Sequence, residues 1–287
     1  MDIGIGLPNA VAGARGEELI EFARRADAAG FSTLGTIDRL VYPNYEPLTT
    51  LAAAAAATER IRLMTSILLA PLRGTTALLA KQAVTVDNLS GGRLMLGLAP
   101  GGREDDYAVS GLDFHARGRR FDAQLEELRK LWSGEERGDG YPVVPEPVTD
   151  GGPRVILGGS GGPAFRRAAK YGAGWMIGGA PPDAFKEALP KLRSAWEEAG
   201  RDGEPRKMAL AYFSLGPDGK EVAQRSLTHY YRWLGDYAQG VADSAATDPD
   251  TVKQYASAFE EAGCDELILF SAGSDPGQVD LLREALG

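Results

Sequence analysis

Apolar residues recur along this chain in short runs, and these runs alternate with longer segments of helical spacing. Residues 76–89 show the helical pattern, in which apolar side chains three or four positions apart line one face: Leu79, Ala83, Val86 and Leu89. A Ser-Gly-Gly sequence follows and predicts the end of the helix, because glycine adopts the left-handed cap without steric cost. The next run, residues 93–98, is mostly apolar and is typical of a strand covered on both faces.

The same alternation extends over the whole chain. The predicted strands are residues 3–7, 32–37, 61–69, 93–98, 154–157, 175–177, 208–213 and 266–270. The predicted helices are residues 17–29, 47–58, 76–89, 121–132, 164–170, 183–199, 221–242, 249–262 and 279–286. Eight strands, each followed by a helix, predict an α/β fold of the (β/α)8 TIM-barrel type with a closed parallel sheet, as one domain over residues 1–287. A doubly wound open sheet is the alternative, and residues 134–152 predict a long surface connection.

Composition narrows the function classes. Of the 287 residues, 44% are hydrophobic, which supports a large core, and the net charge of −9 disfavours nucleic acid as a partner. No apolar run approaches the roughly 20 residues needed to cross a bilayer, and no signal sequence precedes the first strand, so we expect a cytoplasmic protein without membrane association. The single cysteine, Cys264, excludes an internal disulfide and a thiolate metal cluster, and we expect a buried structural thiol and no metal site.

A glycine-rich loop follows the fifth predicted strand and contains Gly158, Gly159, Ser160 and Gly161. It opens a helix in which Pro163 is expected at the first position, where a missing N–H costs nothing. Glycines leave backbone amides uncovered at a helix N-terminus, and Ser160 adds a hydroxyl. The loop therefore predicts an anion site suited to a phosphate.

The same loop also spells Gly-x-Ser-x-Gly, the sequence of a hydrolase nucleophile elbow, with Ser160 as the nucleophile. A catalytic triad would need a histidine after the acidic partner, and the chain has only His115 and His229. His229 lies in a helical segment before the last strand, where a hydrolase does not normally place it. A hydrolase centred on Ser160 is therefore the weaker alternative, from a different class.

One stretch of motifs carries a family resemblance. The chain reads KQ, then D-x-LSGGR, then a strand, and then GG-R-E-D-D-Y within residues 81–107, and this order resembles the bacterial luciferase-like family of flavin-dependent oxidoreductases. The resemblance implies an oxidoreductase that binds FMN in the mouth of the barrel. It implies a monooxygenase that uses reduced FMN and molecular oxygen on a small organic substrate, together with a separate flavin reductase and a homodimer. Hydride transfer with coenzyme F420 is the alternative, and a non-catalytic flavin-binding protein is another.

The resemblance also implies which residues bind the cofactor. In relatives the third strand carries a cis peptide bond behind the flavin ring, and by motif position this bond is Ser66–Ile67. Ala99 takes the place of the reactive cysteine of luciferase. The complete set of predicted cofactor-binding residues is Ser66, Ile67, Ala99, Gly101, Gly102, Arg103, Asp106, Arg120, Gly158, Gly159, Ser160, Gly161, Gly178 and Gly179.

Asp38, Arg39 and Tyr107 are the predicted catalytic residues. Many relatives carry a histidine where this chain has Arg39, and that histidine acts as acid or base. Arginine stays protonated, so Arg39 cannot transfer protons, although it can bind an anion or stabilise a reduced flavin anion. The alternative is a salt bridge at the barrel rim between Arg39 and Asp38 or Glu46.

Two further segments are less specific. His115 lies in a predicted loop and is a weak candidate for substrate contact. The aromatic segment 228–234 predicts either helix packing or a roof over the pocket.

Overall fold

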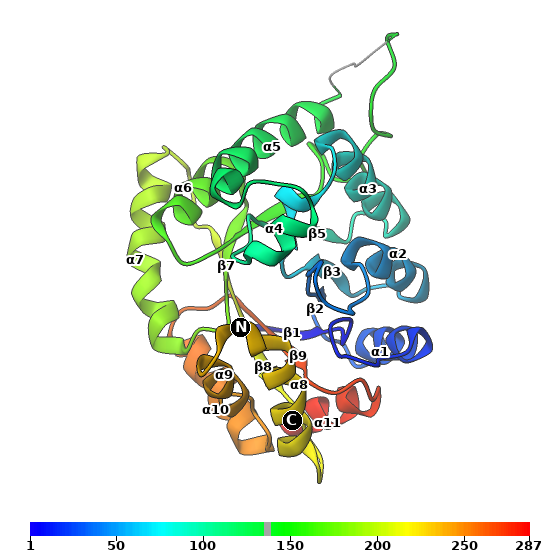
Figure 1. The fold of residues 1–287 in the computed structure, drawn as a ribbon, viewed down its shortest axis with the longest axis vertical. Helices are drawn as coiled ribbons and strands as arrows, with labels where there is room; N and C mark the ends of the chain where they lie inside the picture. The colour runs from blue at the N-terminus through cyan, green and yellow to red at the C-terminus, as the bar shows by residue number, and fades with distance from the viewer. Residues whose placement is uncertain (135–138) are drawn as a thin grey trace.

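The strands form a closed parallel barrel. The structure, a computed structural model, describes residues 1–134 and 139–287. The strands are β1 (Asp2–Gly6), β2 (Thr33–Thr36), β3 (Arg62–Thr65), β4 (Leu68–Leu69), β5 (Leu94–Ala99), β6 (Arg154–Gly158), β7 (Gly174–Gly178), β8 (Arg206–Phe213) and β9 (Glu266–Ser271). They pair in the order β3-β2-β1-β9-β8-β7-β6-β5-β4, and a further β3–β5 pairing closes the ring (Figure 1). The predicted (β/α)8 barrel is confirmed, because β3 and β4 together occupy one strand position.

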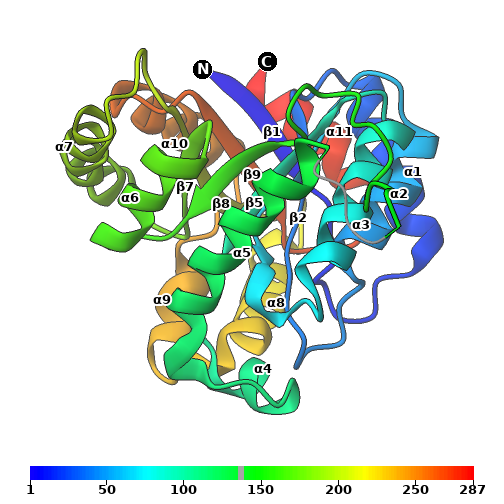
Figure 2. The ribbon, with the colours of Figure 1, turned by 90° about the horizontal axis from the view of Figure 1, so that it is seen from above.

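Helices surround this barrel. They are α1 (Gly16–Ala28), α2 (Pro47–Ala57), α3 (Thr76–Leu89), α4 (Glu104–Val109), α5 (Arg117–Trp132), α6 (Gly162–Tyr171), α7 (Pro182–Glu198), α8 (Gly219–Tyr231), α9 (Tyr237–Asp243), α10 (Pro249–Glu261) and α11 (Gly277–Leu286). In α3, Leu79, Ala83 and Val86 are buried as predicted, but Leu89 is exposed. Figure 2 shows α4, α8 and α9 at the end of the barrel opposite the chain's N-terminus. This is the end at which the strands finish, where barrel enzymes place their sites.

Three predicted elements differ from the structure. The predicted strand 61–69 is divided, and the predicted cis bond Ser66–Ile67 lies in the gap between β3 and β4. The predicted helix 221–242 is wrong as one helix: α8 ends at Tyr231, a 3-10 turn follows (η3, Arg232–Leu234), and Gly235 has a φ of 58°, which ends that turn in a conformation that favours glycine. The glycine-rich loop after β5 contains the short helix α4, which periodicity could not detect in six mostly polar residues.

Four methionines fill the interior of the barrel. They are register neighbours in pairs, Met64 beside Met95 and Met176 beside Met208, and all four are buried. Every methionine of the chain after Met1 therefore lies in one buried cluster inside the barrel. Close to it, the ring of Phe270 occupies the space beside β1, where a side chain on Gly6 would overlap it.

The other end of the barrel is closed by a buried carboxylate. Glu266 of β9 is fully buried and accepts from Arg206 at 2.8 Å, and Arg62 lies 3.2 Å from its second oxygen. Burial raises the pKa of Glu266, but hydrogen bonds from Ser32, Thr33 and Arg206 and the charge of Arg62 outweigh it, so the pKa is below its usual value. The ionised glutamate is therefore well paired, which suits a structural role.

Cys264 is buried between α10 and β9, as predicted for a structural thiol. Burial raises its pKa to about 12, so the thiol stays protonated at neutral pH. Of the predicted connection 134–152, residues 135–138 lie outside the described residues. Among the helices described, none has the length and hydrophobicity required to span a membrane.

The packing of β5 against β3 generates a prediction. A Cβ added at Gly97 would lie 1.9 Å from the carbonyl oxygen of Thr65, and backbone cannot move aside as a side chain can. We expect Gly97→Ala to lower the free energy of unfolding by about 3 kcal/mol, measured by urea denaturation. Gly16→Ala is the matched control, because a Cβ at Gly16 meets no atom within 4 Å. Equal stability of the two variants would contradict this description of the barrel wall.

Candidate active site at the barrel mouth

The carboxylate of Asp106 joins two loops at the mouth of the barrel. Asp106 lies in α4, which follows β5, and its side chain is 1% exposed. One oxygen accepts from the backbone amides of Leu40 at 3.1 Å and Val41 at 2.7 Å, in the loop after β2. The other lies 3.3 Å from Nε of Arg39 and 3.8 Å from Nε of Arg103. One buried carboxylate therefore positions two of the three arginines predicted to belong to the site, Arg39 and Arg103.

Arg39 has contacts with three groups of the mouth, and one nitrogen of its guanidinium stays available to a ligand. Besides its ion pair with Asp106, it donates to the carbonyl of Val41 at 3.0 Å. Its guanidinium carbon lies 5.6 Å from the ring centre of Tyr42 and 5.3 Å from that of Tyr230, which comes from α8. Its Nη1 is buried and has no hydrogen-bond partner among the described residues. A buried donor without a partner marks a position where a ligand can accept a bond.

Asp38 and Arg39 do not form a pair with each other. Asp38 accepts from Arg73 and, at 2.8 Å, from the amide of Leu69, while Arg73 also contacts Glu46 at 2.9 Å. Burial raises the pKa of Asp38, although Arg73 and the Leu69 amide oppose that shift. The rim salt bridge considered from sequence, Arg39 with Asp38 or Glu46, is therefore wrong. Both acids use Arg73, and Arg39 uses an acid sixty-seven positions further along the chain.

Side chains of the loop after β5 and of α4 stabilise that loop by contacts among residues 100–107. The buried Tyr107 donates its hydroxyl to the carbonyl of Pro100, directly before Gly101 and Gly102. Burial raises the pKa of Tyr107 to about 12, so it is a poor proton donor at neutral pH. Arg103 contacts Asp105 and stacks on the ring of Trp233 in η3, 4.9 Å from the ring centre. In this structure Tyr107 supports the loop, and its predicted catalytic role remains a prediction.

Ile67, Ala99 and Gly158 meet at the ends of β4, β5 and β6. A Cβ added at Gly158 would lie 2.2 Å from Cδ1 of Ile67 and 3.4 Å from Cβ of Ala99. All three residues were predicted to bind the cofactor, and the barrel brings them together from positions far apart in sequence. The Ser66 hydroxyl, next to Ile67, is buried and has no hydrogen-bond partner among the described residues. Together they form a compact surface with very little side-chain bulk.

Beside this surface the N-terminus of α6 is open. Ser160 is exposed, and the helix begins at Gly162, which places Pro163 at its second position, one later than predicted. Within the described chain, the amides of residues 160–162 donate to no protein acceptor, and the first turn of α6 carries no acidic residue. Uncovered amides and a favourable helix dipole fit an anionic group. Gly159 is held by its carbonyl, which accepts from Trp175 at 2.6 Å.

Two other predicted binding elements lie differently. Arg120 donates to the carbonyls of Pro71 at 2.9 Å and Gly74 at 3.3 Å, so it ties α5 to the loop after β4. Gly178 and Gly179 end β7, and an added Cβ at either meets no atom within 4 Å. Neither His115 nor His229 hydrogen bonds to Ser160 within the described part of the chain, which gives the hydrolase alternative no support.

Several contacts of the mouth had no signal in the sequence, and they involve Asn9, Tyr42 and Tyr212, which no motif singled out. Asn9, fully buried after β1, exchanges hydrogen bonds with the backbone of Ile37 at 2.8 and 2.9 Å. The Tyr42 hydroxyl lies 2.9 Å from Nδ1 of His229, and the hydroxyls of Tyr212 and Tyr231 are 2.6 Å apart. These contacts join positions up to 187 residues apart, which periodicity along one chain cannot reveal.

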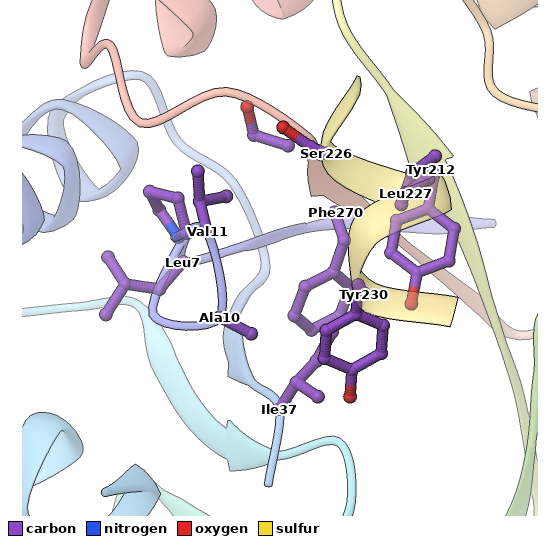
Figure 3. A pocket seen from close by; sticks show the side chains of 11 residues that line it. Leu7, Ala10, Val11, Ile37, Tyr212, Ser226, Leu227, Tyr230 and Phe270 are labelled. Carbon is purple, nitrogen blue, oxygen red and sulfur yellow. The ribbon is translucent and has the colours of Figure 1, made fainter. Parts of the chain in front are cut away.

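The aromatic segment on α8 also closes a space at the mouth. Figure 3 shows Tyr230 and Phe270 directed toward the loop after β1, with Ile37 beneath them. The cavity between them has a volume of about 20 Å³, which is room for a water molecule only. The predicted roof is therefore packed against the loops after β1 and β2 rather than standing over a large pocket there.

The fold and this site define a class: a (β/α)8-barrel protein whose buried charges and open amides are gathered where the strands end. The family described as luciferase-like monooxygenase matches residues 1–279. The chain belongs to this family, as its motifs predicted.

Individual relatives are more distant. An uncharacterised protein of Mycobacterium tuberculosis is 31% identical over 210 residues, which covers 63% of this chain and 72% of that protein. An FMNH2-dependent dimethylsulfone monooxygenase of Pseudomonas fluorescens is 26% identical over 259 residues, covering 85% of this chain and 66% of that protein. A monooxygenase from Streptomyces bottropensis has a similar structure, with a TM-score of 0.82, 24% identity and coverage of 100% and 98%; at that identity the likeness shows the fold alone.

The role of Asp106 can be tested by removing its charge. Asp106→Asn keeps the shape but leaves the buried Arg39 without its anion, so we expect a loss of about 3–5 kcal/mol in the free energy of unfolding. The control is Asp105→Asn, because Asp105 is 41% exposed and should contribute no more than about 1 kcal/mol. Urea denaturation of both variants measures the difference. A loss at Asp106 no greater than that at Asp105 would show that the two loops are held by other contacts.

Proposed function

We propose that this protein is a flavin-dependent monooxygenase that uses reduced FMN and oxygen on a small organic substrate. The observation that supports this most is the meeting of Ile67, Ala99 and Gly158 beside the uncovered amides of residues 160–162. A surface with little side-chain bulk next to an anion site suits a flat ring that carries a phosphate on a short chain. FMN is such a molecule.

The residues fit this cofactor at both ends. The amides at the start of α6 and the exposed Ser160 hydroxyl would hold the phosphate. Ile67, whose side chain packs over Gly158, and Ala99 would receive the ring. When bound, reduced FMN supplies the electrons and the reaction with oxygen, so the protein needs few acids or bases of its own.

The chain's own contribution is electrostatic and positional. Arg39 keeps a positive charge at the mouth, and Asp106 and the two tyrosine rings fix its position. Its unpartnered Nη1 would donate to negative charge that develops on the ring or on the substrate. His229, bound to Tyr42 beside Arg39, is the group we assign to proton transfer in place of the missing histidine.

The named relatives bear on the cofactor and the partner. The relative that is FMNH2-dependent by name obtains reduced flavin from elsewhere, so we propose a separate flavin reductase as a partner. An F420-dependent secondary alcohol dehydrogenase has a similar structure, with a TM-score of 0.79 and 20% identity. Coenzyme F420 is therefore the second candidate.

Reconstitution of the protein with each cofactor in turn distinguishes the two candidates. A shifted absorption spectrum and tight binding of FMN would support the proposal. Binding of F420 alone would make F420 the cofactor instead of FMN.

The phosphate contact generates a prediction. A charge-assisted hydrogen bond contributes roughly 1.5–3 kcal/mol, so Ser160→Ala should weaken FMN binding by about tenfold or more. Fluorescence titration with FMN measures the affinity. Ser194→Ala is the matched control, because Ser194 is exposed on α7 and its hydroxyl contacts only Glu198. Equal affinities of the two variants would remove Ser160 from the cofactor site.

The charge of Arg39 can be tested separately. We expect Arg39→Met to slow the reoxidation of bound reduced FMN by oxygen by about tenfold or more, because the fixed charge in a dry site is lost. Arg39→Lys keeps the charge and should stay within about threefold of the original rate. Stopped-flow flavin absorbance measures both rates, after circular dichroism has shown that each variant is folded. Unchanged rates in both variants would assign Arg39 to structure only.

A further inference from the structure

A second and larger cavity lies at the mouth end of the barrel. It has a volume of about 560 Å³, is open to solvent, and is lined by the loop after β7, by β8, by η3 and α9, and by α10. Gly179, predicted to bind the cofactor, forms part of its wall, and so do Leu210 and Tyr212 of β8, whose side chains belong to the barrel interior. The cavity, which we call the β7–β8 pocket, therefore adjoins the mouth of the barrel. Its size is that of a small-molecule site.

The chemistry of the pocket wall is strongly apolar. None of the residues described as lining it carries a charge. Three of the hydroxyls in the wall have partners in the protein: Tyr255 donates to the carbonyl of Ser244 at 2.6 Å, Ser244 donates to the carbonyl of Val241 at 2.8 Å, and Tyr212 bonds to Tyr231 at 2.6 Å. The fourth, on Tyr237, belongs to a side chain that is 81% exposed to solvent. Burial also raises the pKa of Tyr212 and Tyr255, so both stay neutral. A charged ligand would lose its hydration here and gain no counter-charge.

Two glycines enlarge the pocket. A Cβ added at Gly179 or at Gly240 meets no atom within 4 Å. Gly240 lies inside the helix α9, where glycine is less favourable than alanine and where no close neighbour requires it. The absence of a side chain at Gly240 therefore leaves this side of the pocket open.

We propose that the β7–β8 pocket binds the substrate and that the substrate is a neutral, mainly apolar molecule. This inference rests on the proposed function, because it takes the cofactor to lie next to Gly178 and Gly179. The two sites then bind different molecules: the phosphate of the cofactor binds at Ser160, and the carbon skeleton of the substrate binds between β8 and α9. Arg39 and His229 lie outside this pocket and act on the reacting group rather than on the skeleton.

The test uses two fluorescent probes of equal shape, 1-naphthalenemethanol, which is neutral, and 1-naphthoate, which is anionic. We expect the full-length protein to bind the neutral probe at least about tenfold more tightly than the anion in a fluorescence titration. Gly240→Leu should fill the pocket and weaken binding of the neutral probe about tenfold. Ala180→Leu fills it from the opposite wall and serves if the first variant does not fold. Gly16→Leu, on α1, is the control and should bind the probe normally.

The outcomes separate this inference from the proposed function. Both pocket variants leave the α6 loop unchanged, so FMN titration of the same samples reports on the cofactor site independently. Loss of probe binding with intact FMN binding supports both proposals. Normal probe binding in the filled variants, no probe binding in the original protein, or equal affinity for 1-naphthoate overturns the substrate pocket and leaves the flavin proposal standing. The protein could instead bind the neutral probe, lose that binding in the filled variants, and fail to bind FMN. That result would support a pocket for neutral ligands but would overturn the proposal that the protein is a flavin enzyme.

Discussion

A single buried carboxylate, that of Asp106, determines how the mouth of this barrel is assembled. Removing a carboxylate from water is costly, and the cost is offset only when its oxygens are fully paired. Here two amides of the loop after β2 donate to one oxygen, and the guanidinium of Arg39 lies 3.3 Å from the other as an ion pair without a hydrogen bond. The ring of Tyr230 from α8 then lies on Arg39, and Trp233 lies on Arg103. Loops that are remote in sequence therefore depend on one anion for their relative positions.

The predicted cofactor surface is made largely by leaving side chains out. Gly158 gives Ile67 the space it occupies, and the amides after it are exposed because no side chain covers them. The opposite end of the barrel is built in the reverse way, with Glu266 paired to Arg62 and Arg206. One end is thus closed by satisfied charges, and the other keeps unsatisfied donors. This difference between the two ends is what makes one of them suitable for a ligand.

The barrel could be predicted from sequence because strand and helix periodicity are local properties. The glycine-rich loop at Ser160 was also found locally, since its position between a strand and a helix is visible in the residues themselves. The partner of Arg39 could not be found in this way. Two acids, Asp38 and Glu46, lie within seven positions of Arg39, but the acid that binds it is brought there by the pairing of β3 with β5. Likewise, α8 ends at Tyr231 and a 3-10 turn leads to Gly235, a change that the spacing of apolar residues in this segment does not reveal.

The four methionines inside the barrel affect how easily its core adjusts to change. Thioether side chains are unbranched and flexible, so they adjust to small displacements that a β-branched core would resist. Met64, Met95, Met176 and Met208 therefore give the barrel interior side chains that can adjust their conformations when neighbouring residues change. A barrel built on this plan can acquire new specificities in its mouth while its lower half remains unchanged.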